Sequence, residues 1–284
     1  MIADMAPVAV HDARMRRRRA LLAYFGLALG ISWLVELPLI ALNRGWIEWP
    51  VPFALHYLAS LGPAIAALVV TACTGGSEGL RELLRRITKW RVGWGWALVA
   101  ALSPAALFGV AAMVVRLFGG EWPVLWLLGQ VNYLPYLGLG APLLWLATFG
   151  FGEEIGWRGF ALPRLQHSRS ASAATLILGL MWVLWHVPTF FYHSTYEDLG
   201  LIVLPGMIFG ILCGAVVMTW LYNSTHGSVL MVALWHGLFD FFTASAAGQG
   251  ATQIIMSAGV IAWALLIANR LGPDSFSRSA KHVL

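Results

Sequence analysis

Long apolar runs dominate this sequence and limit what the chain can fold into. Eight runs recur along its length, covering roughly residues 21–42, 52–73, 94–118, 136–157, 173–192, 201–222, 228–246 and 252–270. A helix of about 17–25 apolar residues crosses the hydrocarbon core of a bilayer. Lipid offers no hydrogen bonds to a backbone, so a spanning segment satisfies its own amides as a helix. The sequence therefore predicts an all-α, polytopic membrane bundle of about eight transmembrane helices.

The composition excludes an ordinary soluble domain. Of 284 residues, 59% are hydrophobic and only 11% are charged, and the mean hydropathy is +0.74. Soluble domains carry about a quarter charged residues. Cys73 and Cys213 fall in or beside predicted spans and form no recognisable pair. We interpret both cysteines as small apolar residues.

The positive charges predict the orientation of the bundle. Sixteen of the 18 Lys and Arg residues fall in four clusters, at 14–19, 81–91, 158–169 and 270–281. With eight spans, all four clusters lie on the same side. The positive-inside rule then places both termini and the even-numbered loops in the cytoplasm. The pI of about 9.6 follows from this topology, and we expect no nucleic-acid partner because no soluble basic domain is available.

The N-terminal segment "RMRRRR" precedes an apolar run, as in a signal peptide. The run at 21–42 is too long for one, however, and no Ala-x-Ala cleavage site follows. We expect a retained first span. The chain then divides into a basic cytoplasmic N-terminus (1–20), a transmembrane domain (21–270) and a cytoplasmic tail (271–284).

The segment 74–91 is the longest connection on the predicted cytoplasmic side. Its sequence "SEGLRELLRRI" alternates leucines and arginines at helical spacing. This pattern predicts an amphipathic helix that could lie on the inner membrane surface. A short solvated connector is the alternative.

Six ionisable residues in or directly beside the predicted spans are the strongest functional signal. Such residues are costly within a membrane and indicate function unless partners compensate them. The fourth, fifth and seventh predicted spans bring these six residues into one half of the bilayer. They are Glu153, Glu154, Arg158, His186, His236 and Asp240.

Helical spacing separates the two glutamates of the segment "FGFGEEIGWR". Glu154 lies four residues before Arg158, in the order that favours an ion pair on one helix face. Glu153 is rotated about 100° from that face. We therefore predict a structural Glu154–Arg158 pair and leave Glu153 as the reactive carboxylate. The alternative is that both glutamates reach the membrane interface by snorkelling.

The two histidines follow similar segments, "LMWVLWH" ending at His186 and "LMVALWH" ending at His236. Both spans run outward from the cytoplasm, so the rings are expected at similar depths on parallel helices. Asp240 lies four residues after His236 and shares its face. Glu36 and His56 lie in the first two spans, where snorkelling or a packing hydrogen bond would explain each.

These residues resemble the three motifs of the CPBP intramembrane proteases. The motifs are Glu-Glu-x-x-x-Arg at 153–158, an aromatic-x-x-x-His at 182–186, and His-x-x-x-Asp at 236–240, within a region of about 139–242. The family includes the type II CAAX prenyl endopeptidases and relatives linked to bacteriocin processing. Two positions depart from the pattern, since Trp182 replaces the usual Phe and Asp240 replaces a frequent Asn.

The resemblance implies an intramembrane endopeptidase in a multi-pass protein of a bacterial cell membrane. Its partners would be the lipid bilayer and a membrane peptide or protein, membrane-associated or prenylated. Glu153 would act as general base on a water, which His186 would orient and polarise. His236, with Asp240, would stabilise the oxyanion, and Glu154 and Arg158 would hold the geometry. An ionised Asp240 would repel an oxyanion, so Asp240 either is protonated or orients His236.

Two alternatives stay open from the residues. His186 and His236, with Asp240 or Glu153, could hold Zn²⁺ with an open position, although no His-Glu-x-x-His helix is present. We assign no cofactor and expect activity without a metal. Outside enzymes, the same groups could form a proton or solute pathway, or belong to an idle immunity or scaffold protein. A transporter would show broken helices in two related halves.

Overall fold

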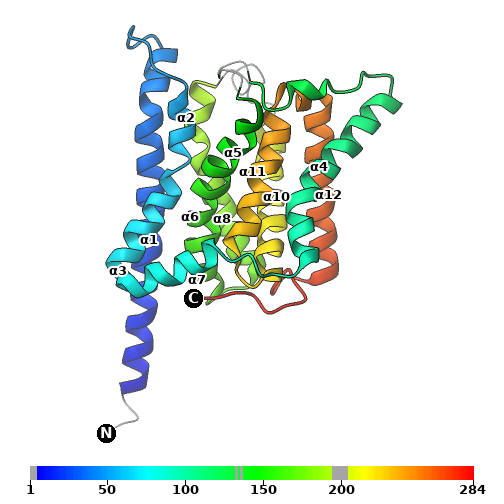
Figure 1. Ribbon diagram of the computed structural model, residues 1–284. Helices are drawn as coiled ribbons and strands as arrows, with labels where there is room; N and C mark the ends of the chain where they lie inside the picture. The colour runs from blue at the N-terminus through cyan, green and yellow to red at the C-terminus, as the bar shows by residue number, and fades with distance from the viewer. Residues whose placement is uncertain (1–4, 132–133, 135–136, 194–203) are drawn as a thin grey trace.

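The computed structural model describes residues 5–131, 134, 137–193 and 204–284 (Figure 1). Every regular element in these ranges is helical, and none is a strand. The predicted starts of two spans, at 136 and at 201–203, lie outside the described residues. The predicted all-α architecture is confirmed.

The long helices cover the predicted apolar runs, but the first begins 16 residues before its run and the second ends 14 residues beyond its run. They are α1 (Met5–Asn43), α3 (Gly62–Ile87), α4 (Trp94–Leu117), α8 (Ala171–Trp185), α10 (Leu204–Ser224), α11 (Val229–Ala244) and α12 (Ala251–Leu271). A short helix α2 (Ala54–Ala59) precedes α3, and the described connections include the 3₁₀ turns η1 (Leu125–Leu127), η2 (Gly138–Gly140), η5 (Val187–Phe191) and η7 (Ala246–Gly248).

The fourth apolar run is helical but irregular. It consists of α5 (Ala141–Trp145), the π-helical η3 (Leu146–Glu153), α6 (Glu154–Gly156), the π-helical η4 (Trp157–Ala161) and α7 (Leu162–Gln166). We call residues 141–166 the central run. π-Helical turns are rare and are frequent at functional sites. Their position on both sides of Glu154 marks this part of the bundle for closer attention.

Six helical stretches of the described chain are long and apolar enough to cross a membrane. They are Asp12–Asn43, Ala54–Ile87, Trp94–Leu117, Ala171–Phe191, Leu204–Ser224 and Ala251–Leu271. The shorter apolar helix α11 and the central run complete the set of eight predicted segments. The protein is therefore a multi-pass membrane protein, as the sequence predicted.

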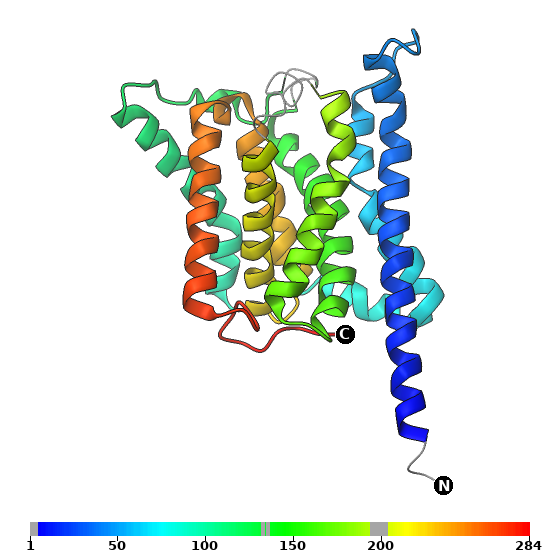
Figure 2. The same ribbon diagram turned by 180° about the vertical axis from the view of Figure 1, so that it is seen from behind.

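Basic side chains and exposed tryptophans mark the ends of the bundle. Both termini lie at the same end (Figures 1 and 2), where Lys89 donates to the carbonyl of His226 and Lys281 donates to that of Arg169. Exposed tryptophans occur near both ends: Trp90 and Trp94 at the end with the termini, and Trp46, Trp49, Trp122 and Trp126 beyond the opposite helix ends. Tryptophan favours the two membrane–water interfaces. This distribution fits a bundle that spans the bilayer.

The helix expected in the segment 74–91 is the second half of α3. Gly76 has a positive φ of 56°, which glycine adopts without strain, and the helix bends there (Figure 1, cyan). Arg86, expected on the polar face, is instead buried, and its guanidinium donates to Glu82, to the Gly159 carbonyl and to the Tyr222 hydroxyl. The segment is thus bound to the core and is not a solvated connector.

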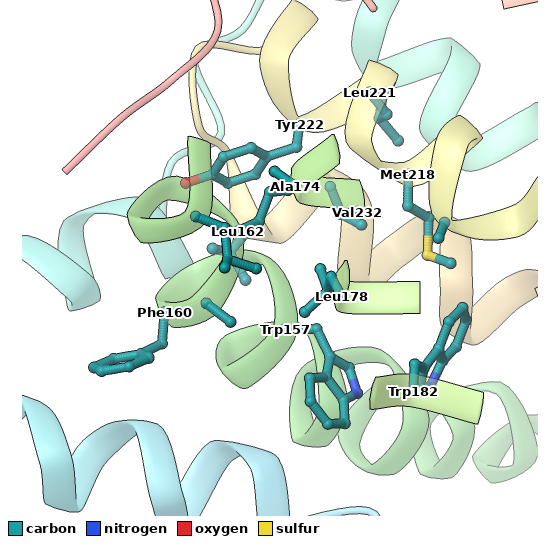
Figure 3. Close-up of a cluster of buried hydrophobic side chains, with 14 of the residues drawn as sticks. Trp157, Phe160, Leu162, Ala174, Leu178, Trp182, Met218, Leu221, Tyr222 and Val232 are labelled. Atoms are coloured by element: carbon teal, nitrogen blue, oxygen red, sulfur yellow. The ribbon is translucent and has the colours of Figure 1, made fainter. Parts of the chain in front are cut away.

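The main core packs around the inner half of the central run. Trp157, Phe160 and Leu162 meet residues of α8, α10 and α11 in one cluster (Figure 3). From α1, Tyr24 stacks on Phe160 with ring centroids 4.8 Å apart and meets Trp157 edge-on at 5.8 Å. The central run is therefore enclosed on several sides by other helices.

The tail 272–284 folds back on this end of the bundle. Asn223 of α10 and Gln166 of α7 form a buried reciprocal amide pair, with bonds of 2.8 and 3.1 Å. Asn223 also donates to the Ser275 carbonyl at 2.7 Å, and Gln166 to the His282 carbonyl at 2.8 Å. The tail thus completes the hydrogen bonding of two buried amides.

Close backbone approach sets the position of the central run against α3. A Cβ atom on Gly156 would lie 2.5 Å from the carbonyl oxygen of Pro63 and 2.5 Å from the Tyr24 hydroxyl. Real Cβ contacts are essentially never that short, so only glycine fits. Small residues let membrane helices approach closely where lipid supplies no hydrophobic drive.

We expect Gly156→Ala to destabilise the protein by about 1–3 kcal/mol, the usual cost of overpacking a filled core. Gly109→Ala in α4 is the matched control, because nothing lies within 4 Å of the Cβ it would add. That variant should be as stable as the wild type or slightly more so. Thermal unfolding in detergent, followed by size-exclusion chromatography, measures both. Equal unfolding temperatures for the two variants would contradict the close packing.

Candidate active site

The two glutamates lie deep inside the bundle. Glu153 is 2% exposed and Glu154 is fully buried, so the snorkelling alternative is wrong. Glu153 follows Ala141 by 12 residues and precedes Gln166 by 13. The acids are therefore near the middle of the central run, because the helical path continues past Trp157 to Gln166.

Two tryptophans hold the Glu153 carboxylate. Its Oε2 accepts hydrogen bonds from Trp182 Nε1 at 2.6 Å and from Trp157 Nε1 at 3.2 Å. Both indole rings belong to the buried cluster drawn in Figure 3. An indole N–H can only donate, so the two bonds suit an acceptor carboxylate and fix one of its oxygens. The sequence marked Trp182 as an aromatic position but did not identify it or Trp157 as a donor.

Glu154 contacts two basic side chains of the site through a single oxygen. The predicted pair with Arg158 is present, with Nη1 2.7 Å from Oε1 and both side chains fully buried. The same oxygen lies 2.9 Å from Nδ1 of His236 on α11. The guanidinium of Arg158 also lies 5.0 Å from the centre of the Trp182 ring. Sequence reasoning missed the contact to His236, because 82 residues separate the partners and no local spacing reports it.

His236 lies between two carboxylates. Nδ1 faces Glu154, and Nε2 lies 3.3 Å from Oδ2 of Asp240, one helical turn later on the same face. Carboxylate oxygens accept, so a ring that donates at both nitrogens fits this arrangement. The contact expected between His236 and Asp240 is therefore present. The Asp240 side chain remains 30% exposed, whereas the Glu154 side chain is fully buried.

His186 ends α8 and is held by the helix that precedes it. Its Nδ1 lies 2.7 Å from the carbonyl oxygen of Trp182. A carbonyl only accepts, so Nδ1 carries the hydrogen and Nε2 of the neutral ring is left as an acceptor. Thr189 donates its hydroxyl to the carbonyl of His186 and closes the turn. This tautomer suits a histidine that takes or orients a proton.

The two histidines occupy different positions along their helices. His186 follows the start of α8 by 15 residues and His236 follows the start of α11 by seven. At 1.5 Å per residue these are about 22 and 10 Å of helix. Both rings nevertheless flank Trp182, at centroid distances of 5.7 Å for His186 and 5.3 Å for His236. Trp182 therefore joins the three motifs.

The donor set does not fit a zinc ion in this arrangement. Both ring nitrogens of His236 face carboxylates, and one oxygen of Glu153 accepts from two indoles. Within the described ranges, no three His, Cys, Asp or Glu side chains are grouped to hold a metal. The predicted zinc set of His186, His236 and Asp240 or Glu153 is thus not assembled there. A catalytic zinc site wants three protein ligands and an open position.

Glu36 and His56 form a second polar group near the opposite end of the bundle. The Tyr192 hydroxyl donates to Glu36 at 2.6 Å and lies 2.8 Å from Nδ1 of His56. Glu36 is 2% exposed. Of the two expected explanations, the packing hydrogen bond is therefore correct for Glu36.

We expect Glu154→Gln to destabilise the protein more than Glu153→Gln. Removing one partner of a buried ion pair costs about 3–5 kcal/mol, and Glu154 is the ion-pair partner of the fully buried Arg158. In Glu153→Gln, the new amide oxygen would still accept from the two indoles. Unfolding temperatures of the purified variants measure the difference. A Glu154→Gln protein as stable as Glu153→Gln would show that Arg158 does not depend on Glu154.

Comparison with known proteins relates this site to a family of membrane proteases. A family model described as "Type II CAAX prenyl endopeptidase Rce1-like" matches residues 135–242, which include every site residue from Glu153 to Asp240. A CAAX prenyl protease 2 from Methanococcus maripaludis is 26% identical over 189 residues, which are 63% of this chain and 68% of the relative. The three motifs, the helical membrane fold and both similarities agree, and together they support the family of CAAX-type intramembrane proteases.

Proposed function

We propose that this protease hydrolyses peptide bonds with a water activated by Glu153 and His186. The position of Trp182 carries the proposal, since its indole N–H binds Glu153 and its ring flanks both histidines. One side chain thus gathers the three motifs around a common space. Paired acid–base groups around one point are the arrangement that general base catalysis of hydrolysis requires.

In the first step, Glu153 removes a proton from the water while the oxygen attacks the substrate carbonyl carbon. His186 accepts a hydrogen bond from the same water at Nε2, because its Nδ1–H is committed to the Trp182 carbonyl. A tetrahedral intermediate with a negative oxygen forms. When the C–N bond breaks, Glu153 returns its proton to the leaving amine, so the residue ends the cycle as it began.

His236 is the donor to the oxyanion in this mechanism. Of its two contacts, the one to Asp240 is the longer, at 3.3 Å, and Asp240 is the more exposed partner. Nε2–H can therefore turn toward a developing negative oxygen, while Nδ1–H stays on the buried Glu154. Fixed donors aimed at developing charge are usually the largest catalytic contribution. The contact between Asp240 and Nε2 of His236 supports a role for Asp240 in orienting His236. It does not favour Asp240 as a neutral donor to the oxyanion.

We infer that the substrate is a peptide whose C-terminal segment carries a prenyl chain. The relative named CAAX prenyl protease 2 supports this class. A prenyl chain adds about 0.8 kcal/mol per buried CH₂ to membrane binding, and so brings a peptide to the depth of a buried site. The end of the bundle that gathers the basic clusters would face the cytoplasm by the positive-inside rule.

We expect Glu153→Gln to lower kcat by about 10²–10⁴-fold, the usual contribution of a general base. The probe is a fluorescence-quenched peptide ending in farnesyl-Cys-aliphatic-aliphatic-X, cleaved by protein in liposomes. Glu121→Gln is the matched control, since Glu121 is exposed in a loop outside the site. The same peptide without its farnesyl chain tests the substrate class and should be cleaved poorly. Normal turnover by Glu153→Gln would overturn the assignment of the base.

We also expect activity to survive removal of metal ions, because His236 and Glu153 are already engaged with other side chains. The measurement combines elemental analysis of the purified active protein with turnover after exhaustive chelation. Turnover should stay within about twofold, a difference of about 0.4 kcal/mol in the barrier. One zinc per chain, with activity lost on stripping and restored by zinc, would make this a metalloprotease.

A further inference from the structure

Helix α1 contacts the turn that carries His186 at three positions. Trp33 Nε1 donates to the carbonyl of Trp185 at 3.3 Å, and Asn43 Nδ2 donates to that of Phe191 at 3.0 Å. Between them, Glu36 accepts from the Tyr192 hydroxyl at 2.6 Å. These partners extend from the residue before His186 to the sixth residue after it. The helix therefore holds both sides of the turn.

The contact through Tyr192 has a defined direction. The Tyr192 hydroxyl has one hydrogen and gives it to Glu36. Nδ1 of His56, 2.8 Å from the same oxygen, must then be the donor to Tyr192. His56 thus donates to Tyr192, and Tyr192 donates to the Glu36 carboxylate. This chain of hydrogen bonds joins α2, the end of η5 and α1. Three separate segments thus meet at one hydroxyl.

Packing alone does not explain a carboxylate at residue 36. Glu36 is 2% exposed within an apolar span, and burying a carboxylate is costly unless its hydrogen bonds compensate. An apolar residue would fill the same space without that cost. A buried polar group that is kept despite its cost fits a role in fixing one particular arrangement.

The turn after His186 needs such external support. Pro188 has no N–H, so α8 cannot continue, and the chain enters the short 3₁₀ turn η5. Its own bonds to the carbonyl of His186 come from the amide and hydroxyl of Thr189. The Trp182 carbonyl fixes Nδ1 of His186 from the side of α8. On the other side, the position of the turn depends on where α1 and α2 hold Trp185, Phe191 and Tyr192.

We propose that Glu36 and Tyr192 are positioning residues for His186. They lock the turn so that Nε2 of His186 is presented to the water that Glu153 activates. The inference rests on the proposed function, but its residues differ from those of the motifs. Glu36 lies outside the segment 135–242 that the family model matches. Helix α1, which contains none of the three motifs, therefore supports the turn after His186.

The experiment compares four variants with the farnesylated probe. Tyr192→Phe and Glu36→Ala break the bond and should lower kcat about 10- to 100-fold, the effect of misplacing a catalytic group by about 1 Å, while KM stays within about twofold. Glu36→Gln restores an acceptor oxygen for Tyr192 and should recover most of the lost turnover. Ser32→Ala is the control, because Ser32 of α1 bonds the Ala59 carbonyl of α2 and not the His186 turn.

Hydrogen–deuterium exchange at residues 186–193 gives a second measurement that does not require turnover. Exchange should rise in Tyr192→Phe and Glu36→Ala and stay at the wild-type level in Ser32→Ala and Glu36→Gln. Wild-type kcat in folded Tyr192→Phe, or a rise in KM without a fall in kcat, overturns the proposal. If the wild type cleaves no probe, the proposed function fails, and unchanged exchange in Tyr192→Phe would then refute the support of the turn as well.

Discussion

The buried Glu154 carboxylate is the interaction on which the site depends. One oxygen of this group binds Arg158 within the central run and His236 on α11. Without it, a fully buried guanidinium would lose its counter-charge, and the imidazole would lose the partner that orients Nδ1. Interiors of low dielectric strengthen a complete set of such contacts and penalise an incomplete one. The glutamate therefore stabilises the fold and the geometry of His236 through the same atom.

The site also shows how a membrane protein can place acids far from water. Glu153 receives two indole N–H groups, and Glu36 receives a tyrosine hydroxyl. Aromatic side chains with a polar tip serve this purpose, because they remain apolar toward the surrounding helices while the tip donates. The chain is rich in Trp for this reason as well as for its interfaces, since Trp157 and Trp182 are buried while Trp46 and Trp90 are exposed.

The apolar runs were sufficient to predict the helical membrane bundle, because length and hydropathy decide whether a segment can span. The i,i+4 spacing likewise predicted the contacts of Glu154 with Arg158 and of His236 with Asp240, which are local. The π-helical turns, the bond from Trp182 to Glu153 and the bond from His236 to Glu154 could not be predicted this way. Each depends on how helices distant in sequence come together. The burial of Arg86 was missed for the same reason, since its partners Gly159 and Tyr222 come from other helices.

The docked tail bears on the order in which the bundle assembles. Residues 272–284 follow all the described helices in the sequence, so they reach Gln166 and Asn223 only after α12 has been made. Until then, each of these two amides lacks one of its bonds, and the junction of α7 with α10 is incomplete. Because chains are synthesised from the N-terminus onward, docking of the tail would be a late event in biogenesis. A nascent chain arrested before residue 272 would therefore hold its helices with these two hydrogen bonds still unmade.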